Sequence, residues 1–218
     1  MSARDEILSR VRAALRDVPR GSGPDEVEVP RSYVRTRGVA DVPDLFAERV
    51  ADYRATVVRI GSDGVREAVR EALAGAQARR VVVPDGVPGE WLPGEDTGIE
   101  IVRDSPPLPA HELDHVDAVV TGAAVGIATT GTIVLDHEAD QGRRALTLVP
   151  DVHVCVVRES QVTDDVPDGV QRLAEAVAQR RPLTWISGPS ATSDIELDRV
   201  EGVHGPRTLH VILVADSG

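Results

Sequence analysis

The spacing of hydrophobic residues predicts a separate helix at the start of the chain. Apolar residues recur three and four positions apart between Ile7 and Val18, which indicates an amphipathic helix that ends at Pro19. Residues 19–31, PRGSGPDEVEVPR, are rich in proline, glycine and acidic residues and are expected to form a mobile linker. We therefore expect an appendage of helix and linker over residues 1–40, whose helix is free to dock on a partner protomer, and one domain over residues 41–218.

Apolar runs alternate with amphipathic stretches throughout the second part of the chain. Helices are predicted over residues 41–55, 63–78 and roughly 167–181. The β-branched runs 56–60 and 80–84 flank the second helix, which is the β-α-β signature of a buried parallel pair of strands. Further strands are predicted at 99–102, 117–122, 131–136, 145–150, 152–157, 183–187 and 208–215. The close spacing of the middle strands predicts some antiparallel pairing, so the fold class is α/β, with a mixed, largely parallel sheet flanked by helices.

Composition and charge exclude several classes of function. The net charge of −12 would repel nucleic-acid phosphates and anionic membrane surfaces. All 24 basic residues are arginine, so no lysine is present for a Schiff base, a pyridoxal phosphate anchor or a P-loop. No run approaches the roughly 18 apolar residues of a membrane span, and the charged N-terminus does not resemble a signal peptide. We expect a cytoplasmic protein without membrane insertion.

Cys155 is the single cysteine, and it lies inside the apolar run VHVCVV. One cysteine can form neither an internal disulfide nor, by itself, the ligand set of an iron–sulfur cluster. We expect no cofactor to be bound by this chain alone, and any iron–sulfur chemistry to come from a partner protein.

Residues 111–115, HELDH, match the H-E-x-x-H pattern of zinc proteases. That pattern needs a long helix, because the two histidines must share one helix face. Three prolines in SPPLPA precede the motif and a predicted strand follows it, leaving room for about one helical turn. A solvated turn is therefore favoured over a zinc site.

The stretch TGAAVGIATTGTIVLD, residues 121–136, places glycines and threonines between two predicted strands. It is not G-x-G-x-x-G, so it does not indicate dinucleotide binding. Two interpretations stay open. One is tight strand packing. The other is a cradle of backbone amides that holds a carboxylate or phosphate with the help of hydroxyl groups from Thr129, Thr130 and Thr132.

The connection between the last two strands contains a second group of candidates. Ser187-Gly188-Pro189-Ser190 follows the carboxyl end of the strand 183–187, and ligands bind at that edge in open α/β sheets. SDIE at 193–196 reads as a capping box, with Gly202 as the C-cap of the helix that it would begin. His204 follows Asp194 by ten residues, so a cluster of Asp, Glu and His is sterically easy; a solvated turn is the alternative for His204.

Other histidines and arginines are less informative. His137, His153 and His210 lie in or after predicted strands and are interpreted as structural. Arg143 and Arg144 offer guanidinium groups that can fork onto a carboxylate, and solvated surface charge is the simpler account of at least one of them.

Four ordered motifs, GIATTGTIVL, GRRALTLVPDVHVCVV, ISGPSATSDIE and GVHGPRTLHVILV, resemble the lactate utilization protein C family, whose shared unit is called the LUD domain. The resemblance covers about residue 45 to the end of the chain. It implies a fold similar to the sugar-phosphate isomerase and CoA transferase-like group. It also implies a role in the oxidation of L-lactate to pyruvate alongside two partners, at least one of which carries iron–sulfur clusters.

The resemblance implies a site made from the motif residues. The acid-base candidates are Asp194, Glu196 and His204, and no metal ligand is assigned. The ligand-binding candidates are Thr130, Gly131, Thr132, Ser187, Gly188, Pro189, Ser190, Thr192, Gly205 and Pro206. The family commonly reads Gly-Ile-Ala-Glu-Thr-Gly-Thr, whereas here Thr129 stands in the glutamate position. This departure argues against a carboxylate nucleophile or general base at that position.

Two functions follow as hypotheses. The first is a non-redox component of an L-lactate oxidation system, which binds a small carboxylate or a surface of an iron–sulfur partner protein. The alternative is an autonomous isomerase or transferase acting on a phosphorylated sugar or an acyl-CoA, with Asp194, Glu196 and His204 as acid-base groups. The missing lysines and Thr129 weigh against the alternative, and homo-oligomerisation is left open.

Overall fold

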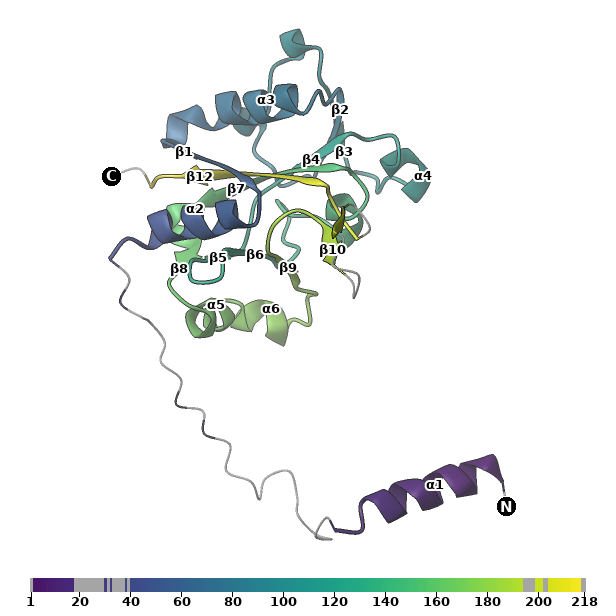
Figure 1. Cartoon of the computed structure of the whole chain (residues 1–218). Helices are drawn as coiled ribbons and strands as arrows, with labels where there is room; N and C mark the ends of the chain where they lie inside the picture. The colour runs from purple at the N-terminus through teal and green to yellow at the C-terminus, as the bar shows by residue number, and fades with distance from the viewer. Residues whose placement is uncertain are drawn as a thin grey trace. The chain divides into compact units, whose positions relative to one another are not determined.

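A six-stranded sheet of parallel strands forms the centre of the α/β domain. The computed structural model describes residues 2–17, 30, 32, 38, 40–193, 199–201 and 204–216. In the sheet the strand order is β1-β12-β7-β4-β2-β3, and all neighbouring strands are parallel (Figure 1). These strands are β1 (Thr56–Ile60), β2 (Arg80–Val83), β3 (Glu100–Arg103), β4 (Ala118–Thr121), β7 (Val152–Arg158) and β12 (Thr208–Val214). The α/β class predicted from the sequence pattern is confirmed.

A second, four-stranded sheet contains the antiparallel pairing that the close strand spacing predicted. Its order is β8-β5-β6-β9, formed by β8 (Val162–Thr163), β5 (Val125–Ile127), β6 (Thr132–Leu135) and β9 (Thr184–Ile186). β6 is antiparallel to both β5 and β9, and β5 is parallel to β8. A single mixed sheet would include this antiparallel hairpin. In the structure the hairpin instead belongs to a separate small sheet that packs beneath the large one.

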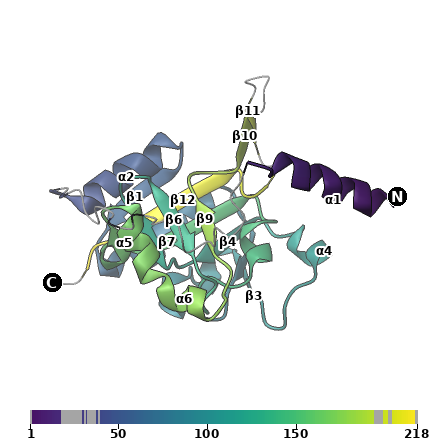
Figure 2. The ribbon, with the colours of Figure 1, turned by 90° about the horizontal axis from the view of Figure 1, so that it is seen from below.

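Helices cover both sheets in layers. α3 (Val65–Gly75) lies on one face of the large sheet, and α2 (Val42–Asp52) lies on the opposite face, on the side of the small sheet (Figure 1). α5 (Val166–Arg172) and α6 (Ala174–Ala178) lie over the strands of the small sheet in the view from below (Figure 2). The predicted helix over 167–181 is thus divided in two at Leu173. Fully buried Phe46 of α2 packs on Gly126 of β5, where a Cβ would lie 3.1 Å from the ring.

The N-terminal helix forms a unit of its own. The chain divides into compact units over residues 1–33 and 34–218. α1 (Ala3–Ala14) begins at a capping box, in which Ser2 Oγ accepts from the amide of Asp5 at 3.3 Å and the Asp5 carboxylate accepts from the amide of Ser2 at 3.0 Å. It ends before the predicted Pro19. None of its residues is buried, including the apolar residues Ile7, Leu8 and Val11.

Two local predictions are wrong. Residues 145–150 were expected to form a strand, but Arg144–Thr147 form a 3₁₀ helix, η4, in which the amide of Leu146 donates to Arg143 O at 3.0 Å. β4 and β12 already pair with the two edges of β7. Residues 145–150 therefore find no free strand edge beside β7 with which to pair. Residues after Ser193 were expected to form a helix, but β10 (Ala191–Ser193) and β11 (Arg199–Glu201) pair as antiparallel strands.

The HELDH motif forms the single turn that its proline context predicted. α4 (Ala110–Leu113) has only four residues, and His111 and His115 are both exposed. Two histidines on such a short turn lack the long helix face of a zinc protease. Within the part of the chain that the structure describes, no helix is both long and apolar enough to cross a bilayer.

Burial on α3 makes a quantitative prediction about stability. Val69 is 0% exposed between α3 and the large sheet, whereas Val177 of α6 is 57% exposed. Val69→Ala removes two buried carbon atoms and leaves a cavity, so we expect it to lower the free energy of unfolding by about 2 kcal/mol. Val177→Ala is the same change on an exposed helix face and should alter it by less than about 0.5 kcal/mol. Urea denaturation of both variants checks this; equal effects would contradict the assigned core.

Candidate functional site

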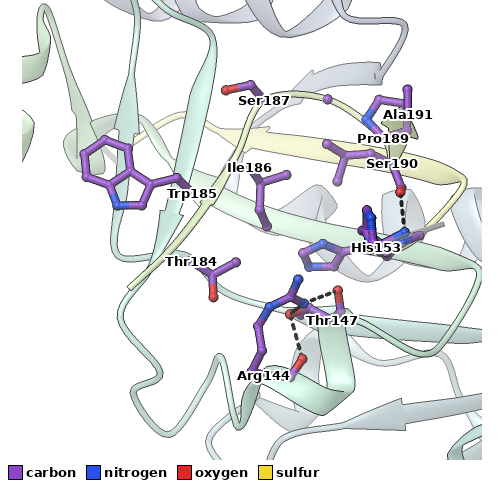
Figure 3. Close-up of a pocket in the computed structure, with 15 residues that line it drawn as sticks. Arg144, Thr147, His153, Thr184, Trp185, Ile186, Ser187, Pro189, Ser190 and Ala191 are labelled. Atoms are coloured by element: carbon purple, nitrogen blue, oxygen red, sulfur yellow. Dashed lines mark hydrogen bonds between the residues drawn. The ribbon is translucent and has the colours of Figure 1, made fainter. Parts of the chain in front are cut away.

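A pocket of about 260 Å³ lies where the amino-terminal ends of β7 and β12 meet β9. Its lining comes from η4, the start of β7, the segment from β9 to β10, and the residues that lead into β12: Arg144, Thr147, His153, Thr184, Trp185, Ile186, Ser187, Gly188, Pro189, Ser190, Ala191, His204, Gly205, Pro206 and Leu209. Figure 3 shows Arg144 and Thr147 on one side and the segment from Ser187 to Ala191 on the other. The pocket therefore joins four segments that are distant in sequence.

The position of this pocket differs from the sequence-based expectation. The loop after the strand 183–187 was expected at the carboxyl edge of an open parallel sheet. In the structure that strand is β9, which belongs to the small sheet and runs antiparallel to β6. Its loop reaches the amino-terminal ends of the parallel strands β7 and β12. The rule for open parallel sheets does not apply to this strand, because the rule concerns strands within the parallel sheet.

Backbone hydrogen bonds hold together the two segments that form one side of the pocket. The amide of Ser190 donates to Pro206 O at 2.8 Å, and the amide of His204 donates to Ser190 Oγ at 3.2 Å. Gly188 has a φ of +87°, and a Cβ at this position would lie 2.5 Å from the Cβ of Tyr53. Ser187, Gly188, Pro189, Ser190, His204, Gly205 and Pro206 are thus brought together as lining residues, with His204 exposed.

The threonine-rich turn between β5 and β6 supports the pocket from behind instead of lining it. Thr132 Oγ1 lies 2.9 Å from Ser187 Oγ, and Thr130 Oγ1 donates to Thr132 Oγ1 at 2.8 Å. Gly131 has a φ of +57° and lies so close to α2 that a Cβ would come within 2.6 Å of the Arg49 backbone. The packing interpretation of this turn accounts for Gly131, and the hydroxyl groups link the turn to the pocket loop.

Thr129, the residue that departs from the family pattern, faces away from the pocket. Its hydroxyl donates to Asp165 Oδ1 at 2.8 Å, and the same carboxylate accepts from the amide of Val166 at 2.8 Å where α5 begins. Thr129 therefore supports the N-cap of α5. This role needs a hydrogen-bond donor, which a carboxylate cannot supply.

The two adjacent arginines have different environments. Arg143 forks onto Asp104, with Nε to Oδ2 at 2.8 Å and Nη2 to Oδ1 at 3.0 Å, and this ion pair lowers the pKa of Asp104 against the opposing effect of burial. Arg144 lines the pocket, and its Nη1 donates to Thr147 O at 2.9 Å. No carboxylate among the described residues pairs with Arg144, and partial burial lowers the pKa of its guanidinium. Arg144 is therefore an exposed cation of the pocket lining.

His153 also lines the pocket, although its place in a strand suggested a structural role. It is 1% exposed, and its Nε2 lies 2.8 Å from Thr121 Oγ1 on β4. Burial, with a smaller effect of the positive charge of Arg144, lowers the pKa of His153 to about 4. The imidazole is thus neutral at pH 7. A sequence signal existed: a histidine within a run of buried valines must find a polar partner.

The remaining candidates fall outside the pocket or outside the described residues. Asp194 and Glu196 lie outside the described residues, and the side chain of Thr192 on β10 is also undescribed, so the cluster with His204 stays a prediction. His137 joins Gly142 O through Nδ1 at 2.6 Å and Thr184 Oγ1 through Nε2 at 2.9 Å, which is a structural role. No group of three or more His, Cys, Asp or Glu residues in the described part is arranged to hold a metal ion.

Comparison with known proteins places the chain in a family. Residues 110–214 match the model of the LUD domain. The chain is 49% identical to Lactate utilization protein C of Deinococcus radiodurans, over 97% of this chain and 95% of that protein. The chain belongs to the lactate utilization protein C family.

A second relative and a solved structure also resemble this chain. Lactate utilization protein C of Bacillus subtilis is 24% identical over 97% of this chain and 96% of its own length. The crystal structure of a DUF162 family protein from Deinococcus radiodurans superposes with a TM-score of 0.69 at 47% identity, covering 79% of this chain and 96% of that chain. The resemblance stated from the four motifs is confirmed.

The neutral state of His153 predicts a pH dependence of stability in this family member. The unfolded chain binds a proton at His153 below pH 6.5, whereas the folded protein does so only near pH 4. The stabilising effect of a neutral His153 is therefore present above pH 6.5 and is lost as the pH falls through this window. Between pH 7 and pH 4.5, wild type should lose about 2 kcal/mol more unfolding free energy than His153→Asn.

Urea denaturation at both pH values measures this difference. His111→Asn is the matched control, because His111 is exposed on α4 and its removal should leave the pH dependence unchanged. Parallel pH profiles for wild type and His153→Asn would contradict the depressed pKa.

Proposed function

We propose that this protein serves lactate utilization by binding a small carboxylate in the pocket beside β9. Relatives that are 49% and 24% identical are named Lactate utilization protein C. The observation that carries the proposal is Arg144, which lines the pocket without a carboxylate partner among the described residues. A guanidinium group stays charged and binds a carboxylate through two parallel hydrogen bonds, so Arg144 can hold an anionic ligand in this pocket.

The size and lining of the pocket favour a ligand of few atoms. Its volume of about 260 Å³ lies below the roughly 300 to 1,000 Å³ of sites for drug-sized ligands. Thr147, Thr184 and Ser190 contribute hydroxyl groups to the lining, and Ile186 and Leu209 add an apolar surface. Such a lining suits a small acid that carries both a polar substituent and a short apolar part.

Electron transfer belongs, in this proposal, to iron–sulfur partner proteins. Cys155 is the only cysteine of the chain, and burial raises the pKa of its thiol to about 12. Clusters are held by several cysteine thiolates, whereas this single thiol stays protonated in the core. The protein contributes ligand binding and positioning, and the partners contribute the redox centres.

Arg144→Gln tests the carboxylate site directly. We expect L-lactate and other small carboxylates to raise the melting temperature of the wild type, because they bind only the folded state. Arg144→Gln should weaken this binding roughly tenfold or more, since it removes a charge-assisted hydrogen-bond donor. Arg70→Gln is the control, because Arg70 is a partly exposed residue of α3 that pairs with Glu67 and does not line the pocket. Thermal shift and isothermal titration calorimetry provide the measurements.

Two outcomes would overturn the assignment of the ligand. Stabilisation by a sugar phosphate or a CoA ester, with none by small carboxylates, would favour the autonomous isomerase or transferase. Unchanged carboxylate binding in Arg144→Gln would remove Arg144 from the site.

Growth on L-lactate as sole carbon source tests the physiological role. A strain that lacks only this gene should fail to grow, and the wild-type gene should restore growth whereas the Arg144→Gln gene should not. Co-purification with iron–sulfur proteins from the restored strain tests the partner assignment. Normal growth of the deletion strain, in the absence of a second copy of the gene, would contradict the proposed role.

A further inference from the structure

The N-terminal helix α1 carries an apolar stripe that is exposed along its whole length. Four side chains at helical spacing share this face and are 61%, 37%, 47% and 55% exposed: Ile7, Leu8, Val11 and Leu15. A helix of 12 residues is marginally stable in water, and the packing of an apolar face normally stabilises it. No residue of α1 is buried, so this helix has the sequence pattern for such packing without the packing itself.

The segment that forms α1 is also present in relatives. The alignments with Lactate utilization protein C of Deinococcus radiodurans and of Bacillus subtilis each cover 97% of this chain, which leaves about seven of its 218 residues outside. Since α1 has 12 residues, part of it is aligned in both relatives. A helix that buries no side chain adds little to the stability of the α/β domain, so stability does not explain its presence. Binding of another molecule does.

Arginines border the apolar stripe. Successive residues of a helix are rotated by about 100°, so Arg10 and Arg12 lie on opposite sides of the stripe and Arg4 continues it at the amino-terminal end. Arg10 also pairs with Glu6 at 2.7 Å. Residues 2–17 contain four arginines and three acidic residues, in a chain whose net charge is −12. The stripe therefore complements a surface with an apolar floor and a rim of carboxylates.

The size of the stripe favours a transient partner over a stable dimer. At 1.5 Å per residue α1 is about 18 Å long, and one face of it offers much less than the roughly 800 Å² per partner of a stable interface. Weak electron-transfer complexes lie at the small end of the range of interface sizes. An anionic lipid surface is disfavoured, because the stripe contains no tryptophan or phenylalanine and the chain as a whole is negative.

We propose that α1 docks through this stripe into an apolar groove, bordered by carboxylates, on an iron–sulfur partner protein. This inference rests on the proposed function, which assigns the redox centres to such partners. Residues 15–41 join α1 to α2 of the α/β domain. Docking of α1 therefore raises the effective concentration of the ligand-binding domain beside the partner.

Photo-crosslinking of the full-length protein identifies what binds the stripe. The photoreactive residue p-benzoylphenylalanine replaces Leu8 in cells grown on L-lactate, and Ser9, on the opposite face of α1, is the matched control position. We expect light to join position 8 to a protein that is identified by mass spectrometry and, when purified, contains iron and acid-labile sulfide. Position 9 should give little of this product. A product with a second copy of this chain, a product with lipid, or no product at position 8 would overturn the inference.

Val11→Asp measures the contribution of the stripe to affinity for the crosslinked iron–sulfur protein. Docking would bury the new carboxylate in an apolar groove with an acidic rim, so we expect the affinity to fall about tenfold or more. Ser9→Asp introduces the same residue on the opposite face and should keep the affinity within about twofold of wild type. Both variants should bind small carboxylates as the wild type does, because α1 belongs to a unit separate from the pocket. Equal affinities of the two variants for the iron–sulfur protein would contradict docking through the stripe.

Growth on L-lactate separates a failure of this inference from a failure of the proposed function. We expect the Val11→Asp gene, like the Arg144→Gln gene, to fail to restore growth of the deletion strain, whereas the Ser9→Asp gene restores it. Growth with Val11→Asp but not with Arg144→Gln would overturn the docking of α1 and leave the carboxylate site intact. Growth with both variants would overturn both proposals.

Discussion

The hydrogen-bonded position of β7 at the centre of the large sheet is the constraint on which the rest of the structure depends. All seven of its residues are in register with β12, and four are in register with β4. Both of its faces are covered, by α3 on one side and by α2 with the small sheet on the other. A strand held in this way cannot shift by one residue without moving its valines out of their core positions. His153 and Cys155 are therefore held as firmly as the valines between which they stand.

Because β7 is held in register on both edges, the polar residues at its start have fixed positions and fixed neighbours. His153 is desolvated by the core and hydrogen-bonded to Thr121 of the neighbouring strand, so its neutral state follows from its surroundings. The adjacent arginines show how one position along the chain separates an ion-paired arginine from one that lines the pocket. Arg143 meets the carboxylate of Asp104, whereas Arg144, one residue later in η4, turns into the pocket. Arg143 is the extended N-cap residue before η4, whereas Arg144 is the first residue of η4.

The loop side of the pocket depends on the small sheet. β9 pairs with β6, and the hydroxyl groups of Thr132 and Ser187 join the loops at the ends of these two strands. Gly131 and Gly188, both with positive φ, allow these loops to approach α2 and Tyr53 closely. Motif residues that do not line the pocket thus set the position of those that do. Thr129 is another motif residue that does not line the pocket, because its hydroxyl donates to Asp165 at the start of α5.

Much of the architecture follows from the sequence by itself. Apolar runs of β-branched residues predict the parallel strands, because a strand that is buried on both faces needs no alternation, and the amphipathic spacing predicts α2 and α3. The motifs also identify the family and the loops that line the pocket. Only the tertiary structure decided that residues 144–147 form a helix turn, that Ser193 lies in a strand, and that Arg144 and His153 share a pocket. These outcomes depend on which backbone edges and buried partners remain available after the strands have paired, and this is a property of the assembled sheets that local sequence does not encode.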